Sequence, residues 1–377
     1  MLKSIPLSTP VFDGNENSFL LKALESNQIS TAGKFISDFE EEIKKRTGGF
    51  EVAVTNSGTS AIHLALRLLG IGPGDEVLCQ SFTFCASANP ILYLGAQPVF
   101  IDSEPTTWNI CPEILEEAIL DRLRKGKKPK AIIVVDLFGM PAKFKQINDI
   151  SAKYEIPVVE DAAEALGSSI DGIACGTHGQ YGIFSFNGNK IITTGSGGAL
   201  ISQDLNAMDR AKYLSVQARE NYKYYLHKEV GYNYRMNNVS AGIGLAQILD
   251  LDKKISLRRK KFENYQNLFR DIKGVSTVLE LDGFFSNRWL STFIVSNSET
   301  GLSIEELRLA LLKENIETRY LWNPLHLQPV FKDVPFYGGG SSEKLFSEGI
   351  CLPSSENLSY EDQVRIVDII KNNLIRK

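Results

Sequence analysis

Short hydrophobic runs rich in β-branched residues alternate with amphipathic segments over the first two thirds of the chain. Seven of these runs have the length of a strand: 51–56, 72–80, 97–102, 130–138, 157–162, 181–187 and 197–202. Between the first two, residues 60–70 repeat hydrophobic positions at helical spacing. Strands buried on both faces and separated by helices predict an α/β protein with a large, mixed but mostly parallel sheet.

The pattern differs at the two ends of the chain. Residues 1–15 contain two prolines and predict an extended arm, and a helical pattern follows over 16–47. Beyond about residue 250 the background is more charged, and helical or strand spacing recurs over 251–272, 289–296, 303–316 and 360–375. We therefore expect a large domain over 1–250 and a smaller C-terminal α+β domain over 251–377.

Composition narrows the class of protein. The chain has 377 residues, of which 43% are hydrophobic and 23% charged, and its net charge of −4 provides no overall field for nucleic acid or an anionic membrane. The basic segment 122–130 contains no aromatic residues, so we interpret it as a solvated loop. No hydrophobic leader or membrane-spanning run is visible, and we expect a cytoplasmic protein.

Cysteine usage points to a reducing compartment. The chain has five scattered cysteines without a C-x-x-C pair: Cys79, Cys85, Cys111, Cys175 and Cys351. An odd number at these spacings argues against a disulfide framework and against a structural zinc site. We therefore expect no metal centre.

The first candidate site segment is TNSGTSAIHLAL, residues 55–66, where a predicted strand turns into a predicted helix. The first N–H groups of a helix, together with its positive dipole end, favour a bound phosphate. Gly58 allows close backbone approach, and Thr59 and Ser60 add hydroxyl donors. The same residues also suit an ordinary helix cap, so the segment alone leaves both interpretations open.

The second segment is PVVEDAAEALGS, residues 157–168, in which a buried type of strand leads into Glu160 and Asp161. Ligands of parallel sheets bind at the carboxyl ends of the strands. Asp161 could hold a protonated ring nitrogen through a charge-assisted hydrogen bond, or it could cap a following helix.

The third segment is FSFNGNKIITTGSGGAL, residues 184–200, which places Lys190 between hydrophobic stretches and a glycine-rich turn. A desolvated lysine amine is a useful nucleophile, although a lysine is more commonly a surface residue. The three segments together provide for a phosphate, a ring nitrogen and an aldehyde that condenses with an amine. Pyridoxal 5′-phosphate carries all three groups.

Longer motifs extend this interpretation. The chain contains SGTSAIHLAL, EVLCQSFTFCASANPILYLGAQPVFID, VVEDAAEALGS, FSFNGNKIITTGSGGAL and GYNYRMNNVSAGIGLAQ. In these motifs it resembles the DegT/DnrJ/EryC1/StrS nucleotide-sugar aminotransferases from about residue 5 to 370. The resemblance implies a fold-type-I, pyridoxal phosphate-dependent enzyme.

The resemblance also implies roles for single residues. Lys190 would bind the cofactor's aldehyde and act as general acid and base, and Asp161 would pair with the ring nitrogen. Phe82 would stack on the ring, its alternative being a core aromatic. Glu164 stands where many relatives carry Gln and would face the phenolic oxygen. The residues that would hold the phosphate are Gly58, Thr59 and Ser185.

One phosphate contact would come from a second subunit. Asn233, in GYNYR, would reach the phosphate bound by the neighbouring chain, with Asn238 as the alternative register. This implies at least a homodimer with shared active sites. A histidine in place of Lys190 would indicate the dehydratase branch, which the lysine argues against.

The substrate branch follows from further stretches. SFNGNKIITT, YNYRMNN, RYLWNPLHLQPVF and CLPSSENLS resemble enzymes that aminate C4 of UDP-4-keto-6-deoxy-N-acetylglucosamine, on the route to bacillosamine or related diamino sugars, although GDP-perosamine synthases share the Gly-Asn-Lys element. Asn187 and Asn189 are candidate substrate contacts or turn residues. His326 is a candidate substrate contact or a structural histidine.

The implied reaction is a ping-pong transamination in which L-glutamate donates the amino group and a nucleotide-linked keto sugar accepts it. One lysine would serve as the base in both halves. Two other classes remain open: a different pyridoxal phosphate reaction, such as a desulfurase using Cys351, and a non-enzymatic regulator on the same fold.

Overall fold

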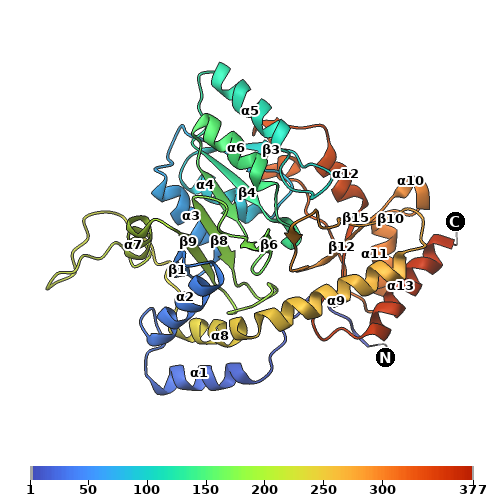
Figure 1. The fold of residues 1–377 in the computed structure, drawn as a ribbon, viewed down its shortest axis with the longest axis horizontal. Helices are drawn as coiled ribbons and strands as arrows, with labels where there is room; N and C mark the ends of the chain where they lie inside the picture. Colours follow the sequence, from blue (N-terminus) through green and yellow to red (C-terminus); the bar gives the residue numbers. More distant parts are fainter. Residues whose placement is uncertain (1–2, 376–377) are drawn as a thin grey trace.

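The computed structural model describes residues 3–375 (Figure 1). Its largest sheet has eight strands, in the order Glu51–Thr55 (β1), Gly198–Ser202 (β9), Tyr181–Ser185 (β8), Val158–Asp161 (β5), Ala131–Val135 (β4), Glu76–Gln80 (β2), Gln97–Ile101 (β3) and Phe336–Tyr337 (β14). The strands from β8 to β14 pair in parallel, whereas β9 is antiparallel to both β8 and β1. The predicted α/β fold is confirmed, and each of the seven predicted runs contains one of these strands.

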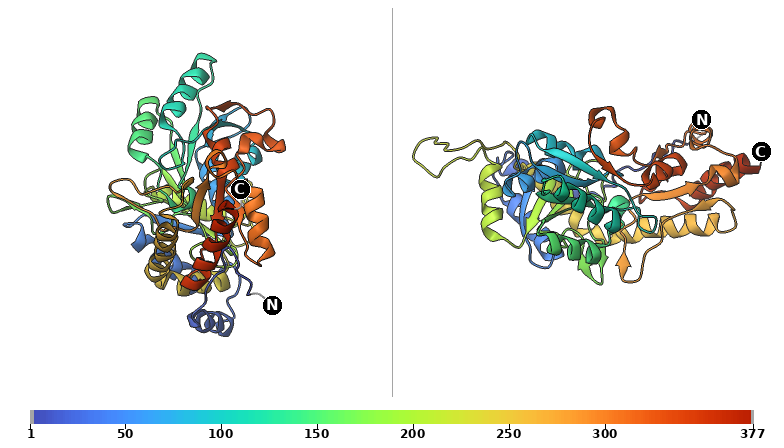
Figure 2. Two further views of the ribbon diagram at one scale, coloured as in Figure 1. Left: turned by 90° about the vertical axis from the view of Figure 1, so that its right-hand side faces the viewer. Right: turned by 90° about the horizontal axis from the view of Figure 1, so that it is seen from above.

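Helices cover both faces of the large sheet (Figures 1 and 2). Alternation along β1 shows how: Val52 and Val54 belong to the same hydrophobic cluster as Phe39 of α2, whereas Ala53 clusters with Ile62 of α3. The helices of this part are Asn15–Glu25 (α1), Lys34–Arg46 (α2), Gly58–Leu68 (α3), Asn89–Tyr93 (α4), Pro112–Arg124 (α5), Phe144–Tyr154 (α6), Leu205–Leu214 (α7) and Asn238–Leu249 (α8).

A long helix, α9, leads from this body to a second sheet (Figure 1). That sheet is antiparallel, with strand order β10-β12-β15-β13. A third, small sheet has the order β11-β6-β7. The bounds are Leu251–Phe269 (α9), Asn297–Thr300 (α10), Ile304–Lys313 (α11), Ser341–Glu348 (α12), Tyr360–Ile375 (α13), Val275–Ser276 (β10), Ser291–Val295 (β12), Gly349–Leu352 (β15), Arg319–Tyr320 (β13), Phe284–Phe285 (β11), Ser169–Ile170 (β6) and Ile173–Ala174 (β7).

The helical pattern over 16–47 is interrupted, contrary to the single helical stretch expected from the sequence. Between α1 and α2, Asn27 has a positive φ of 56° and Gly33 a φ of 147°. A Cβ on Gly33 would lie 2.2 Å from the side chain of Asn238, at the start of α8. The chain therefore turns here so that both helices can pack on α8.

The division near residue 250 stays a prediction, because two segments cross it. Strand β14 comes from the C-terminal part yet pairs with β3 of the large sheet. At the other end of the chain, Ile5 of the N-terminal arm pairs with Ile316. Both connections tie the C-terminal part to the rest of the molecule.

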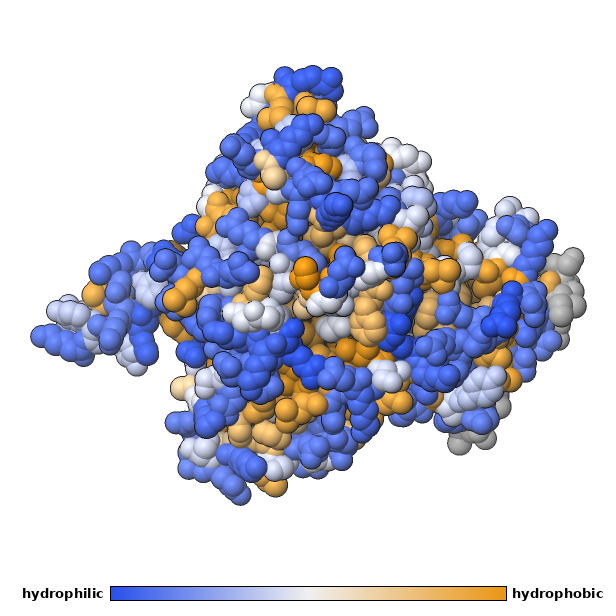
Figure 3. Space-filling model, viewed as in Figure 1, coloured by the Kyte–Doolittle hydropathy of each residue, from blue (hydrophilic) through white to orange (hydrophobic). Residues whose placement is uncertain are grey.

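Residues 219–230, between α7 and α8, project from the body as a long loop (Figures 1 and 2). The face seen in Figure 3 is mostly hydrophilic, with hydrophobic residues in separate patches. Within residues 3–375, no helix combines the length and hydrophobicity needed to cross a membrane.

Candidate active site

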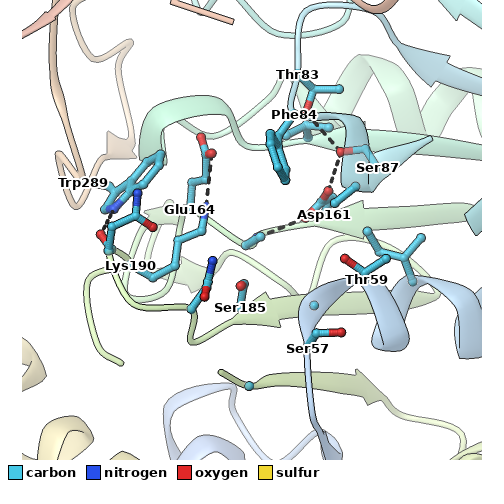
Figure 4. A pocket seen from close by; sticks show the side chains of 18 of the residues that line it. Ser57, Thr59, Thr83, Phe84, Ser87, Asp161, Glu164, Ser185, Lys190 and Trp289 are labelled. Atoms are coloured by element: carbon cyan, nitrogen blue, oxygen red, sulfur yellow. Dashed lines mark hydrogen bonds and ion pairs between the residues drawn. The ribbon is translucent and has the colours of Figure 1, made fainter. Parts of the chain in front are cut away.

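A cavity of about 410 Å³ lies where β5 and β8 end and α3 begins (Figure 4). This is the edge of a parallel sheet at which ligands usually bind. The cavity brings together eight of the residues singled out from the sequence: Gly58, Thr59, Asp161, Glu164, Ser185, Asn187, Asn189 and Lys190. Their roles toward a ligand follow from their contacts.

The N-terminus of α3 forms one wall of the cavity. Ser57 is the helix cap, since its Oγ accepts a hydrogen bond from the backbone N–H of Ser60 at 3.1 Å. A Cβ on Gly58 would lie 3.1 Å from the Cβ of Ser185, and a Cβ on Gly198 would lie 2.5 Å from the backbone nitrogen of Gly58. Because Gly58 and Gly198 have no side chains, the start of α3 can pack closely against β8 and β9. Because Ser57 provides the cap, Thr59 remains at the cavity wall.

Asp161 ends β5 and is only 4% exposed. One carboxylate oxygen accepts a hydrogen bond from the Ser87 hydroxyl at 2.7 Å, and the other accepts from the Ala163 N–H at 3.2 Å. Burial raises the pKa of Asp161, while the Ser87 hydrogen bond and the charge of Lys190 oppose the rise. Residues 162–168 form turns, so Asp161 caps no helix. A cation in the cavity would keep this carboxylate ionised.

Lys190 lies between a carboxylate and an indole ring (Figure 4). Its Nζ is 3.2 Å from Oε1 of Glu164 and 4.0 Å from the ring centroid of Trp289. The lysine side chain is 13% exposed. The amine is therefore inside the cavity and held by two different attractions, an ion pair and a cation–π contact.

Both partners of Lys190 are themselves fixed. The second oxygen of Glu164 accepts a hydrogen bond from the Phe138 N–H at 2.7 Å. Burial raises the pKa of Glu164, and the charge of Lys190 and this N–H oppose the rise. The indole N–H of Trp289 donates to the Asn189 carbonyl at 2.7 Å. Through this hydrogen bond, Trp289 anchors the loop that carries Lys190 and contacts the lysine amine at the same time.

Of the two phenylalanines in SFTF, Phe84 and not Phe82 lies at the cavity. Phe82 is fully buried in the core and lies outside the cavity wall, which is the core-aromatic alternative for this residue. Phe84 follows two positions later, lines the cavity and is 50% exposed, with its ring 5.1 Å from that of Trp322. After β2 the chain leaves the strand geometry, so the spacing from the motif alone did not decide which phenylalanine turns outward.

His326 lies outside the cavity wall, contrary to its expected substrate contact. Its ring stacks on Phe336 at 3.7 Å between centroids, and Nδ1 lies 2.7 Å from the Ser81 hydroxyl. Its other ring nitrogen is 3.2 Å from Glu343. The ring of His326 thus contacts three neighbouring side chains, which favours the structural role of this histidine.

The two asparagines considered for a neighbouring subunit differ sharply. Asn238 is 1% exposed, and its side chain accepts from the Phe35 N–H and donates to the Gln28 carbonyl. Those bonds leave it no freedom to reach a second chain. Asn233 is exposed, and only its backbone carbonyl is engaged, by Asn56 at 3.0 Å. A contact between Asn233 and a second subunit therefore stays a prediction.

The donor set of the cavity fits pyridoxal 5′-phosphate. The first turn of α3 with Thr59 and Ser185 suits a phosphate, buried Asp161 suits a cationic ring nitrogen, and Lys190 supplies the amine. Twelve other residues of the wall were not singled out from the sequence, among them Phe84, Ser87, Trp289 and Trp322. The first two lie in the quoted motif EVLCQSFTFCASANPILYLGAQPVFID and Trp322 lies in RYLWNPLHLQPVF, whereas Trp289 lies in none of the quoted motifs.

Comparison with known proteins agrees with this donor set. The sequence profile of the DegT/DnrJ/EryC1/StrS aminotransferase family matches residues 11–371. The chain is 47% identical to EpsN of Bacillus subtilis, named as a candidate pyridoxal phosphate-dependent aminotransferase, over 98% of this chain and 96% of that protein. It is 36% identical to the GDP-perosamine synthase of Escherichia coli O157:H7, over 98% of both chains.

A solved structure agrees as well. The PLP form of Spr1654 from Streptococcus pneumoniae, described as a candidate sugar aminotransferase, superposes with a TM-score of 0.91 at 25% identity, over 99% of both chains. The fold, the cavity and these relatives lead to one conclusion: the chain belongs to the DegT/DnrJ/EryC1/StrS aminotransferase family and is a pyridoxal phosphate-dependent aminotransferase.

Proposed function

We propose that the enzyme transfers the amino group of L-glutamate to C4 of a nucleotide-linked 4-keto-6-deoxy sugar. The observation that carries the proposal is the single amine of Lys190, held in the cavity beside Glu164. Among the described residues of the cavity wall there is no histidine or cysteine. One amine therefore serves both halves of a transamination, and a desulfurase, which needs a cysteine here, is disfavoured.

The residues of the chain divide the work of this reaction. The bound cofactor supplies an aldehyde and an electron-withdrawing ring. With the cofactor bound, Asp161 would keep the ring nitrogen protonated through a charge-assisted hydrogen bond. The amine of Lys190 would take the α-proton of glutamate in the first half of the reaction and return a proton to the sugar carbon in the second. Glu164 and Trp289 hold that amine near its working position in the meantime.

For the acceptor, we propose UDP-4-keto-6-deoxy-N-acetylglucosamine first, from the stretches around Lys190 and His326 that resemble the UDP-linked branch. A second candidate, a GDP-linked 4-keto sugar, is favoured by the 36% identity to a GDP-perosamine synthase. Both acceptors present the same keto group at C4, so the amine chemistry is the same and the two differ in sugar and base recognition.

The deciding experiment offers the enzyme L-glutamate with UDP-, GDP- and dTDP-linked 4-keto-6-deoxy sugars and reads the product masses. We expect an aminated UDP-linked product at the highest kcat/KM. Preference for the GDP-linked sugar would replace the first acceptor by the second. If L-glutamate does not change the cofactor's visible absorbance, L-glutamate is not the amino donor and the proposal fails.

We also propose that two copies share their active sites. The projecting loop 219–230 exposes large hydrophobic side chains, with Tyr225 80% and Val230 77% exposed, and such side chains favour a protein partner. We expect a dimer by light scattering. Mixing two inactive variants, Lys190→Ala and Asn233→Ala, then restores activity in hybrid dimers, because one of the two sites is intact. Absence of any restored activity would contradict site sharing.

A further inference from the structure

A second cluster of reactive side chains lies behind the active-site cavity. Asp161 faces the cavity, and its neighbour Glu160 faces the opposite side of β5, as successive strand residues do. There, ligand atoms of Glu160, Cys175 and His178 lie within 4.8 Å of one another. The carboxylate of Asp136, which follows β4, adjoins both Glu160 and Cys175. None of these residues lines the cavity.

The surrounding backbone holds this cluster in a fixed shape. Each oxygen of Glu160 accepts a backbone N–H, from Gly176 at 2.5 Å and from His178 at 2.6 Å. The ring of His178 stacks on Phe144 with 4.8 Å between centroids. A Cβ on Gly182 would lie 1.8 Å from the Gly176 carbonyl, so only glycine lets this loop come so close to β8. The loop 175–179 is therefore locked over Glu160.

Two polar atoms of the cluster are reached by no N–H group. Nε2 of His178 has no hydrogen-bond partner, and Oδ2 of Asp136, whose side chain is fully buried, has only the carboxyl of Glu160 and the thiol of Cys175 beside it. Among the described residues, no lysine or arginine forms an ion pair with Asp136 or Glu160. Buried polar atoms without partners call for an explanation, and an ion is one of the usual ones.

We propose that Asp136, Glu160, Cys175 and His178 bind a zinc ion. A thiolate, an imidazole and carboxylates are zinc ligands, and four protein ligands make a closed, structural site. Zinc bonds of about 2.0–2.3 Å separate neighbouring ligand atoms by roughly 3.3–3.8 Å, so Glu160, Cys175 and His178, whose ligand atoms lie within 4.8 Å of one another, need only a small contraction. Asp136 would complete the site from beside Glu160 and Cys175. Binding releases the protons that the thiol and a carboxyl otherwise carry, and Nε2 of His178 gains a partner.

A bound ion would tie together three parts of the large sheet. The ligands come from the end of β4, from β5 and from the loop that precedes β8. Asp161 follows Glu160 directly, so the ion would stiffen the strand end that presents Asp161 to the cavity. The proposal does not depend on the sugar substrate or on the amino donor.

The test measures zinc on the full-length holoenzyme. The protein is equilibrated with zinc chloride, desalted and analysed by mass spectrometry and by X-ray absorption at the zinc edge. We expect about one zinc ion per chain and one sulfur neighbour at about 2.3 Å. A protein that retains no zinc, or zinc without a sulfur neighbour, overturns the proposal and leaves the cluster as a proton-sharing acid pair.

Matched variants locate the ion. His178→Phe keeps a ring to stack on Phe144 but removes the nitrogen, and Cys175→Ser removes the sulfur. Each should weaken zinc binding by about tenfold or more, and Cys175→Ser should also remove the sulfur signal. The control is Cys111→Ser, because Cys111 also touches a carboxylate, that of Glu113 at 3.1 Å, but lies outside the cluster.

Equal zinc binding by all four proteins overturns the proposal, since the ion would then be adventitious. Far-UV circular dichroism checks that the variants fold. If neither variant folds, the zinc-edge spectrum of the unmodified enzyme decides alone.

Discussion

Glu160 and Asp161 are adjacent in β5, but their carboxylates lie on opposite faces of the strand and in different surroundings. Asp161 borders an open cavity that also contains a cation, Lys190, and it is reached by the hydroxyl of Ser87. Glu160 is enclosed by backbone N–H groups and by a thiol, an imidazole and a second carboxylate. The first environment is open to a ligand of the size of a cofactor, whereas the second is enclosed by protein groups that could surround no more than an ion.

The comparison teaches that burial alone does not identify a catalytic carboxylate. Both residues are at most 4% exposed, and burial raises the pKa of both. Only Asp161 faces a cavity that also contains an amine, that of Lys190. A chemical role therefore depends on what shares the space with the carboxylate.

The largest expected effect comes from removing the amine on the cavity side. Lys190→Ala should lower transaminase turnover about 10⁴-fold, since both proton transfers lose their base. Stopped-flow absorbance with L-glutamate measures the loss. Lys143→Ala is the control, because Lys143 pairs with buried Glu104 at 2.8 Å outside the cavity. Near-normal turnover of Lys190→Ala would contradict the assignment of the base.

The second prediction exchanges the two carboxylates for amides. Asp161→Asn should lower kcat by roughly 10²–10³-fold while the protein stays folded, because a charge that acts on the reacting system is lost. Glu160→Gln should keep kcat per folded molecule but destabilise the protein by about 1–3 kcal/mol, because its N–H partners lose a charged acceptor. Turnover and urea unfolding of both variants provide the comparison. If the two variants lose kcat and stability to the same extent, the proposed difference between the two faces of β5 is wrong.

A smaller effect on kcat is expected from changing Trp289, which positions the Lys190 amine. Trp289→Leu removes the indole from Lys190 and the hydrogen bond to Asn189, which should lower kcat about 3- to 30-fold with little change in KM. Trp289→Phe should recover part of the loss, because a ring face remains. Phe285→Leu serves as the control, since the Phe285 ring makes a comparable contact with the Arg259 guanidinium, 4.2 Å away, outside the cavity. A change in KM alone would show that Trp289 binds substrate and does not position the amine.

The smallest effect is the pH dependence of the cofactor-free protein. Burial raises the pKa of Asp161 and Glu164 above their ordinary values of 3.8 and 4.5. The folded protein thus holds these protons more tightly than the unfolded chain, so this stability is present in acid and is lost as the pH rises through the raised values. Denaturant unfolding should show a shallower pH slope for Asp161→Asn, and an identical slope would contradict the raised pKa.

The sequence predicted those features that depend on residues close together in the chain. The strands and the cavity residues Asp161 and Lys190 follow from hydrophobic runs and from motifs in which neighbours in sequence are also neighbours in space. The choice between Phe82 and Phe84 was different, because it depends on how the chain turns after β2. Side-chain direction at such a turn follows tertiary packing, which a motif does not contain.

Long-range contacts were the other missing part. Trp289 lies 99 positions after Lys190 yet contacts its amine, and nothing near either residue signals the pairing. For His326 the sequence left a substrate contact and a structural role open, and the contacts of its ring with Phe336 and Ser81 favour the structural role. The scattered cysteines likewise hid the proximity of Cys175 to Glu160, which only the sheet topology creates.

The placement of the indole rings has an optical consequence. The chain has three tryptophans, and two of them, Trp289 and Trp322, border the cavity, whereas Trp108 is buried in the core. Their emission is therefore a built-in fluorescent reporter: energy transfer to a chromophore seated beside Lys190 should quench it, so filling and emptying of the pocket can be followed without any label.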